Sequence, residues 1–312
     1  MGKELMEELQ PFLRKLSAMQ TALAVMEWDS ETEAPAGGAA YTANVQGTLA
    51  AEYQRAVLDP ECGRLARALL SDPRASVKER GIARLLDKEI REFEKIPPEE
   101  YENYNRIQAQ AFSVWQKAKR ENRFDLFAPH LELLIGYQKK FADLWAKPGQ
   151  KRYDVLLEKY EEGFTMEVLD PFFRELKERI VPLLRQIQEK PVPDDSFLNR
   201  YYPAEKQREF CLWLAEYLGF DLDRGVIGES EHPFTTSFHN HDVRITTHYY
   251  ENQLDSAIFS LIHETGHALY EQDIDDDLTQ TPAGTGSSMG MHESQSRLYE
   301  NMLGRSLAFW KP

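Results

Sequence analysis

The stretch LIHETGHALYEQ, residues 261–272, carries two histidines four residues apart within a segment typical of a helix. On a helix, His263 and His267 lie on the same face and can direct ring nitrogens to one point. Glu264 completes the pattern H-E-x-x-H, in which two imidazoles hold Zn²⁺ and the glutamate acts as base for a metal-activated water. The stretch therefore predicts a helix that supplies two ligands of a zinc site and a catalytic base.

Composition narrows the classes of partner. The chain has 312 residues, 42% of them hydrophobic, and a net charge of −15. Nucleic acids and anionic membranes are held mainly by Lys and Arg, so we expect neither as a partner. The sequence contains no apolar run long enough to span a membrane, and its acidic N-terminus is unlike a signal peptide. With only Cys62 and Cys211, reduced thiols in a cytoplasmic protein are expected.

The first part of the chain reads as successive helices. In SVKERGIARLLDKEIREFEKI, residues 76–96, apolar side chains recur at helical spacing: Ile82, Leu85, Leu86, Ile90 and Phe93. The breaks between such segments are short enough to be connections between helices. We therefore predict a mainly α-helical fold and one domain over 1–312, with a helical scaffold at 1–225 and a metal-site region at 226–312.

The second region begins with residues typical of strands. HPFTTSFHNHDVRITTHYY, residues 232–250, suits two short strands joined by a turn at HNH. Alternation places Asp242, Arg244, Thr246 and His248 on one side of the second strand. A helix at about 253–272 follows, then a Gly- and Ser-rich loop and a last helix from about 291. Gly266 predicts a close approach to its helix, which we assign to the strand at 242–250.

A zinc site needs a third ligand. Seven of the eight histidines fall between 232 and 292, which favours a site over satisfied surface or core histidines. Asp273 is disfavoured because Tyr270 stands where a glycine would turn the chain. The run DIDDD at 273–277 lacks the glycine of a calcium loop and reads as an acidic turn. Glu293 in MHESQSR is our choice, although a carboxylate that only complements a helix dipole would look the same.

Four motifs in order carry a family resemblance: HPF at 232–234, DVRIT at 242–246, HETGH at 263–267 and HESQ at 292–295. Together with residues 26–53, they resemble the carboxypeptidase Taq family of thermostable zinc metallocarboxypeptidases. The resemblance implies a helical zincin-like peptidase with a deep cleft and a small sheet or hairpin beside the metal. It also implies removal of C-terminal amino acids from peptides with broad specificity. Its ligands match His263, His267 and Glu293, and its base matches Glu264. It further implies Zn²⁺, with Co²⁺ as a substitute, and a homodimer.

The remaining candidates would bind substrate or support the ligands. His232 and His248 are candidate donors to the oxyanion that forms during hydrolysis. Asp242 could orient a ligand imidazole through its second nitrogen, and Arg244 could contact substrate or pair with Asp242. Thr246 is also a candidate to bind substrate or to support the ligands.

Members of that family are longer chains, and this sequence ends at NMLGRSLAFWKP, inside what we expect to be a continuing helix. Relative to the family the chain is therefore expected to be incomplete at its C-terminus, and exposed Phe309 and Trp310 should promote association. Two alternatives stay open. One is a zinc endopeptidase or oligopeptidase. The other is a zinc-binding fragment that is inactive without a further C-terminal region.

Overall fold

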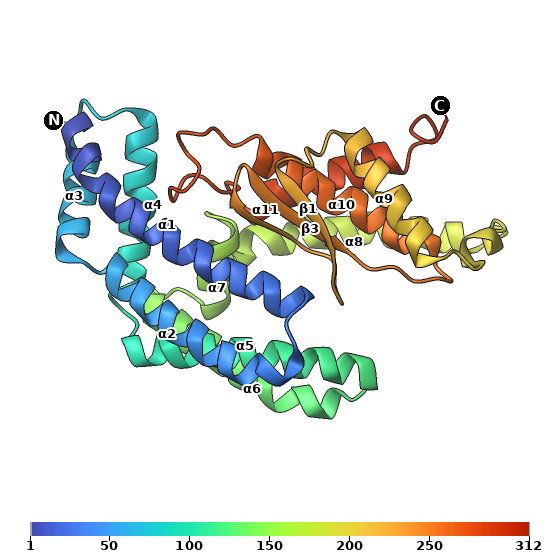
Figure 1. Cartoon of the computed structure of the whole chain (residues 1–312), viewed down its shortest axis with the longest axis horizontal. Helices are drawn as coiled ribbons and strands as arrows, with labels where there is room; N and C mark the ends of the chain where they lie inside the picture. Colours follow the sequence, from blue (N-terminus) through green and yellow to red (C-terminus); the bar gives the residue numbers. More distant parts are fainter. Residues whose placement is uncertain (1, 312) are drawn as a thin grey trace.

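The computed structural model describes residues 2–311, and helices form most of it. Figure 1 shows an N-terminal group of helices, α1 to α7, beside a C-terminal group in which α9 and α10 pack on a small sheet and α11 packs on α10. The helices are α1 (Gly2–Thr32), α2 (Ala39–Val57), α3 (Pro60–Ser71), α4 (Val77–Phe93), α5 (Pro98–Glu121), α6 (Phe124–Trp145), α7 (Arg152–Tyr160), α8 (Met166–Gln188), α9 (Ala204–Leu218), α10 (Leu254–Gln272) and α11 (Met289–Arg297). A π-helical segment, η3 (Leu298–Gly304), continues α11. The predicted mainly α-helical fold is confirmed, and the division at residue 225 stays a prediction.

The helix α4 shows how local sequence sets an element of the scaffold. Ser76 and Glu79 form a capping box, in which each side chain accepts a hydrogen bond from the other residue's backbone N–H. Four of the five predicted apolar side chains of α4 are buried, and Leu85 is half-buried. They join residues of α1, α2 and α3 in the first hydrophobic core. The helical periodicity of 76–96 therefore predicted the buried face correctly.

The sheet has three strands, β1 (Gly225–Glu229), β2 (Thr235–His239) and β3 (Asp242–Thr247), in the order β1-β3-β2. β2 and β3 form the predicted antiparallel hairpin, whereas β1 pairs with β3 in parallel. β1 was not predicted, because its sequence GVIGE contains two glycines, which are depleted in strands. Gly225 is needed there, since a Cβ would lie 2.2 Å from the ring of Phe220.

The second hydrophobic core lies between the sheet, α9 and α10. Val243 and Ile245 of β3 are fully buried in it with Leu261 and Ile262 of α10. This agrees with the predicted alternation along β3 and leaves Asp242 and Arg244 on the other face. The core fixes α10, and with it the H-E-x-x-H segment, against the hairpin.

The C-terminal residues differ from the expectation. The helix does not continue, because residues 305–310 form turns after Gly304. Phe309 packs on Tyr217 and the second core, with ring centroids 6.0 Å apart, so it is not an exposed apolar residue. Trp310 is 43% exposed and donates from Nε1 to the carbonyl of Gly304 at 2.6 Å.

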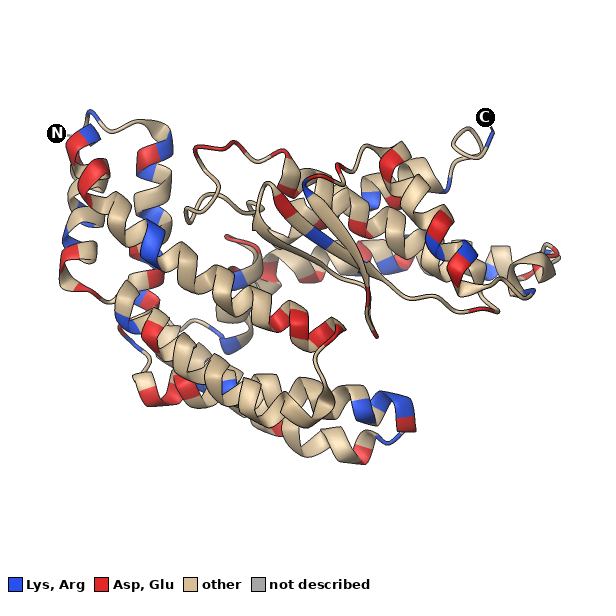
Figure 2. Cartoon of the chain, viewed as in Figure 1, with Lys and Arg blue, Asp and Glu red and all other residues tan. Residues whose placement is uncertain are grey.

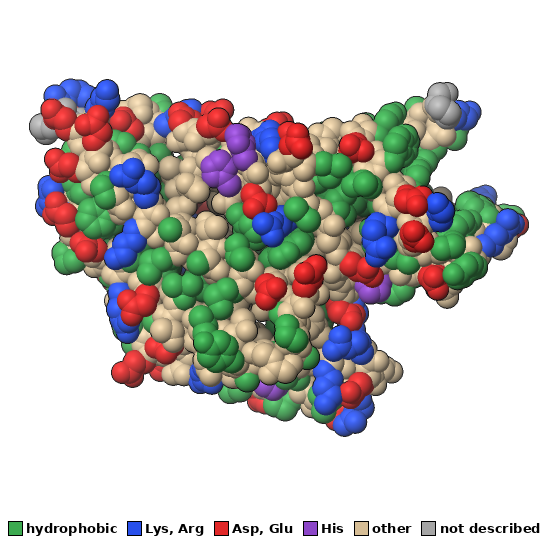
Figure 3. All heavy atoms as spheres, viewed as in Figure 1, with side chains coloured by type: hydrophobic (Ala, Val, Ile, Leu, Met, Phe, Trp, Pro, Cys, Tyr) green, Lys and Arg blue, Asp and Glu red, His purple; other side chains and the backbone are tan. Residues whose placement is uncertain are grey.

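Acidic, basic and hydrophobic side chains are interspersed on the face of the molecule shown in Figure 3. No helix within residues 2–311 is both long and apolar enough to cross a membrane. Cys62 and Cys211 are buried, unpaired thiols that lie in different hydrophobic cores.

The helix α8 packs less than the others, because none of its residues is buried. Its large apolar side chains that are at least 40% exposed are Val168, Phe172, Phe173, Leu176, Ile180, Leu183, Leu184 and Ile187.

Gly266 marks the closest approach to α10. A Cβ at this position would lie 2.7 Å from the Cα of Ser296 and 2.8 Å from the carbonyl oxygen of Gln295. The approaching segment is therefore α11, and the assignment to the strand at 242–250 was wrong. A side chain at 266 would have to displace backbone, which is far less adaptable than a side-chain tip.

We predict that Gly266→Ala lowers the free energy of unfolding by about 1–3 kcal/mol, because it forces α10 and α11 apart. Thermal or urea unfolding of the purified chain measures this change. Gly81→Ala in α4 is the matched control, since nothing lies within 4 Å of a Cβ there. The control should be neutral or stabilising by up to about 1 kcal/mol, and equal stability of both variants would contradict the prediction.

Candidate metal centre

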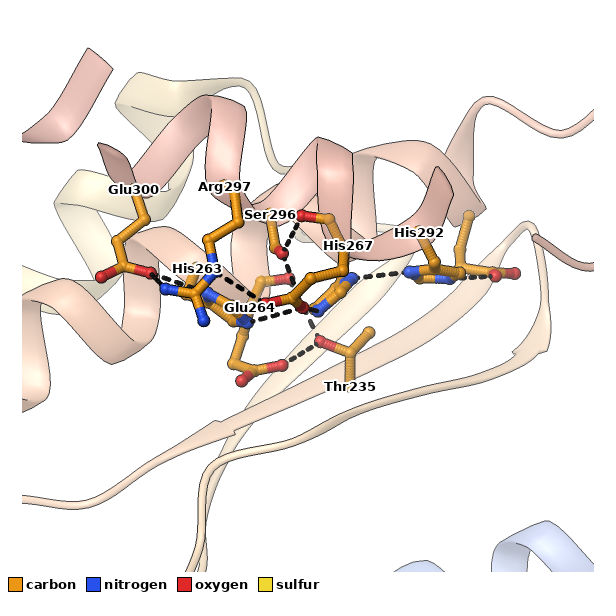
Figure 4. Close-up of polar contacts among 10 residues, drawn as sticks. Thr235, His263, Glu264, His267, His292, Ser296, Arg297 and Glu300 are labelled. Carbon is orange, nitrogen blue, oxygen red and sulfur yellow. Dashed lines mark hydrogen bonds and ion pairs between the residues drawn. The ribbon is translucent and has the colours of Figure 1, made fainter. Parts of the chain in front are cut away.

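Three side chains from α10 and α11 converge on one point (Figure 4). His263 and His267 project from the same face of α10, and Ser288 caps the start of α11 by accepting from the N–H of Met291. Glu293 Oε2 lies 3.4 Å from His263 Nε2 and 3.3 Å from His267 Nε2. Two ligand atoms bound tetrahedrally at zinc distances are separated by about 3.4 Å, so this spacing fits a shared metal ion. The potential ligand atoms of the three residues all lie within 4.8 Å of one another.

The second nitrogen of His263 is held by a carboxylate. Its Nδ1 lies 2.9 Å from Glu300 Oε2, and Glu300 also accepts from Arg297 and Arg305. Burial opposes ionisation of Glu300, but hydrogen bonds from Arg305 and His263 outweigh it and lower the pKa of Glu300. An ionised Glu300 requires a proton on Nδ1 of His263 and leaves the lone pair of Nε2 facing Glu293 and His267.

The second nitrogen of His267 is held by another histidine. Its Nδ1 lies 2.6 Å from His292 Nδ1, and His292 Nε2 lies 2.7 Å from Glu271 Oε1. If His292 donates from Nε2 to Glu271, its Nδ1 accepts from Nδ1–H of His267. Burial, helped by the neighbouring His292 and His263, lowers the pKa of His267 to about 4. Neutral His267 thus has its Nε2 lone pair available to a metal.

Glu293 is kept ionised in this arrangement. Arg297 donates to Oε1 at 2.7 Å, and Ser296 donates to Oε2 at 3.0 Å. Burial opposes the charge, but the hydrogen bond from Arg297 and the nearby His263 outweigh it and lower the pKa of Glu293. Two neutral imidazoles and one carboxylate are the donor set of many catalytic zinc sites.

Glu264 stands beside the cluster and is not one of its three ligands. Its side chain is buried, and Thr235 of β2 donates to Oε2 at 2.6 Å. Burial raises the pKa of Glu264, and the hydrogen bond from Thr235 opposes the rise only partly. A carboxylate with a raised pKa beside a metal can accept a proton and later release it.

Asp242 and Arg244 form an ion pair with each other. Arg244 donates to both oxygens of Asp242, at 2.8 and 2.9 Å, and its guanidinium lies over the Phe238 ring at 4.6 Å. Asp242 therefore does not orient a ligand imidazole, since Glu300 and His292 occupy the Nδ1 positions. Of the two roles considered for Arg244, pairing with Asp242 is the one present.

Thr246 and His248 hold the segment that leads into β2, and His232 belongs to that segment. Thr246 is fully buried, and its Oγ1 accepts from the N–H of Phe234 at 2.9 Å and bonds to Ser230 Oγ at 2.6 Å. His248 Nδ1 lies 2.8 Å from the carbonyl oxygen of Ser230. His232 is exposed, and within residues 2–311 neither histidine hydrogen-bonds to a member of the cluster.

The acidic run at 273–277 serves contacts between elements. Lys78 of α4 donates to Asp275 at 2.8 Å and to Asp277 at 2.9 Å, and Asn240 donates to Asp276 at 2.7 Å. These carboxylates thus have protein partners and form an acidic turn, as the sequence indicated.

Four residues important for the geometry were not singled out by sequence reasoning: Thr235, Glu271, His292 and Glu300. A signal existed for Glu300, because it follows Glu293 by seven residues and so returns to the same helical face. His292 directly precedes Glu293, but adjacent helical residues do not face the same way, so its role could not be read from spacing.

We predict that Glu300→Gln weakens binding of a divalent metal by about 10- to 100-fold, because His263 loses its charged partner. Competition with a chromophoric chelator measures the affinity, using zinc and cobalt. Glu178→Gln on the exposed surface of α8 is the matched control and should leave the affinity unchanged. Unfolding of the metal-free proteins shows whether the effect is on binding or on folding. If Glu300→Gln binds the metal as tightly as the parent protein, the assignment of Glu300 as the support of His263 is wrong.

Comparison with known proteins agrees with this geometry. The sequence profile of the carboxypeptidase Taq (M32) metallopeptidases matches residues 8–312. The chain is 40% identical over 309 residues to carboxypeptidase 1 of Bacillus subtilis (strain 168), covering 98% of this chain and 61% of that protein. It is 35% identical over 323 residues to thermostable carboxypeptidase 1 of Thermus thermophilus, with 98% and 62% covered.

Solved structures give the same result. The crystal structure of BsuCP superposes with a TM-score of 0.96 at 40% identity, covering 99% of this chain and 62% of that one. The M32 carboxypeptidase from Deinococcus radiodurans R1 superposes with a TM-score of 0.87 at 33% identity, with 98% and 62% covered. The chain thus spans about three fifths of the length of these relatives. On the match of the whole chain to their sequence profile, the protein belongs to the carboxypeptidase Taq (M32) family of metallopeptidases.

Proposed function

We propose that this protein is a zinc-dependent metallocarboxypeptidase that releases C-terminal amino acids from peptides with broad specificity. The observation that carries the proposal is the convergence of two imidazoles and one carboxylate beside a buried glutamate of raised pKa. Membership of a metallopeptidase family implies a divalent metal, and the donor set favours zinc. Cobalt(II), which accepts similar nitrogen and oxygen donors, is the proposed substitute.

His263, His267 and Glu293 would hold the metal. When bound, it would polarise the scissile carbonyl and make a water molecule more acidic. Glu264 takes the proton from that water and delivers it to the amine that leaves. Thr235 holds Oε2 of Glu264, which leaves Oε1 to receive the proton. The low exposure of Glu264, 6%, favours the neutral acid and so helps the first of these steps, in which the carboxylate accepts the proton.

The other candidates keep supporting roles in the proposal. His232 and His248 remain candidate donors to the developing oxyanion, and Nε2 is the available nitrogen of His248, since Nδ1 faces Ser230. Asp242, Arg244 and Thr246 shape the hairpin that presents Thr235. We further propose that the protein acts on peptides as a homodimer in the cytoplasm, as the family resemblance implies.

Product analysis tests the function. The metal-loaded chain is incubated with a peptide that has a free C-terminus and with the same peptide amidated there, each with and without chelator. Chelator-sensitive release of single residues from the free peptide alone is expected. Internal cleavage of both peptides would replace the proposal by an endopeptidase. The absence of release despite stoichiometric bound metal would show that the metal centre alone does not suffice for hydrolysis.

We predict that Glu264→Gln binds metal as tightly as the parent but loses hydrolysis by at least about 100-fold, because the amide cannot accept the proton. Amino-acid release and metal content, measured on the same sample, check the two parts. Glu178→Gln is the control for loss of one surface carboxylate. Normal turnover of Glu264→Gln would remove Glu264 from the role of base.

A further inference from the structure

Two adjoining cavities lie beside α1, and the smaller one lies between the N-terminal helices and the hairpin. The larger, of about 1000 Å³, is lined mainly by α1, α2 and α5. The smaller, of about 370 Å³, shares Glu27, Glu31, Phe112 and Trp115 with it and extends to Thr235 in β2. Together they exceed the space that one amino acid needs and match the size of sites that bind extended ligands.

The smaller cavity is connected to the proposed chemistry through one residue. Thr235 lines it, and the hydroxyl of the same residue donates to Glu264 at 2.6 Å. The metal-binding side chains do not line either cavity. A ligand in the smaller cavity would therefore lie next to the group that holds the base, without occupying the metal centre.

The walls of the smaller cavity combine aromatic rings with negative charge. Trp28 packs edge-on against Phe234 with centroids 5.5 Å apart, and Phe112 and Trp115 form the facing wall from α5. Its charged lining consists of Glu27, Glu31 and Glu231, and no Lys or Arg lines it among the described residues. Aromatic faces and carboxylates both attract cations.

One of the three carboxylates already has cations nearby. Glu231 lies 3.4 Å from Arg120 and 3.8 Å from Lys119. Glu27 and Glu31 have no such partner, since neither makes an ion pair or side-chain hydrogen bond with any residue in 2–311. Figure 2 shows a group of acidic residues at the C-terminal end of α1.

The unpaired glutamates are in an unfavourable position. They stand one turn apart on α1, where like charges repel. Glu27 is exposed and Glu31 is half-buried, and both lie in the walls of the two cavities, where other side chains displace part of the surrounding water. This burial raises the pKa of Glu27, and burial together with the charge of Glu27 raises the pKa of Glu31 to about 7. Binding of a cation between them would relieve both the repulsion and the loss of hydration.

We propose that Glu27 and Glu31 bind a positively charged group of a peptide, either its N-terminal ammonium or a lysine or arginine side chain. The inference rests on the proposed function, because it takes the cavity pair to be the place where the substrate lies. It assigns to the first helix a part in selecting substrates, at a distance along the chain from the motifs that hold the metal.

Binding to an inactive protein tests the inference without requiring turnover. Metal-loaded Glu264→Gln is titrated with alanine tetrapeptides in which one residue is either lysine or norleucine, with the substitution moved along the peptide. A second series compares free with acetylated N-termini. In one of the two series, we expect the charged peptide to bind about fivefold more tightly than its uncharged partner. In the lysine series, this difference should appear at one position of the peptide. The series that responds identifies the source of the charge.

Variants then locate the effect. Glu27→Gln combined with Glu31→Gln should abolish the preference for the charged peptide, whereas Glu33→Gln should retain it. Glu33 lies one residue beyond α1, is exposed and lines neither cavity. An unchanged preference in the double variant, or no preference in the Glu264→Gln parent, would overturn the inference.

The outcome is separate from that of the function test. A preference that depends on Glu27 and Glu31 in a chain that hydrolyses no peptide would leave the binding site standing and reject the peptidase. Hydrolysis without a preference for the charged peptides would reject only the proposed cation site at Glu27 and Glu31.

Discussion

The approach of α11 to α10 at Gly266 is the constraint on which the metal centre depends. The two backbones are so close that only hydrogen fits at position 266. This contact places the turn that contains Ser296 against α10, and Glu293 one turn earlier reaches both imidazoles. Hydrogen bonds fix the returning chain as well, because Gly286 donates to Glu271 and Gly290 donates to Glu161. The third ligand is thus positioned by backbone contact rather than by its own side-chain preferences.

The two imidazoles are oriented by different chemistry. A carboxylate stands behind His263, whereas a second histidine, His292, backed by Glu271, stands behind His267. Around the cluster, the formal charges of Glu293 and Glu300 are balanced by Arg297 and Arg305. Glu264 and Glu271, the other two carboxylates beside the cluster, have no arginine partner among the described residues and hydrogen-bond to Thr235 and His292 instead. The two arginines thus offset only two of the four carboxylates that surround the candidate ligands.

The elements that could be predicted from the sequence are those whose signals are local. The hairpin, the helix at 254–272 and the apolar face of α4 follow from periodicity and turn residues, which act within a few positions. Gly266 indicated a close approach, but the partner depended on how a loop folds back, which no local pattern encodes. The strand β1 was missed because its stability comes from pairing with β3 rather than from its own composition. His292 and Thr235 were missed because contacts between separate elements give them their importance.

The absence of buried residues along α8 has a consequence for local stability. Helices in proteins owe most of their stability to tertiary packing, and α8 also contains Pro171 and Pro182, each of which removes a backbone donor. Its amide hydrogens should exchange with solvent through local opening at a small free energy, while those of α4 exchange only in larger unfolding events. We therefore expect α8 to be among the first described segments to open, before the well-packed region that holds the metal centre.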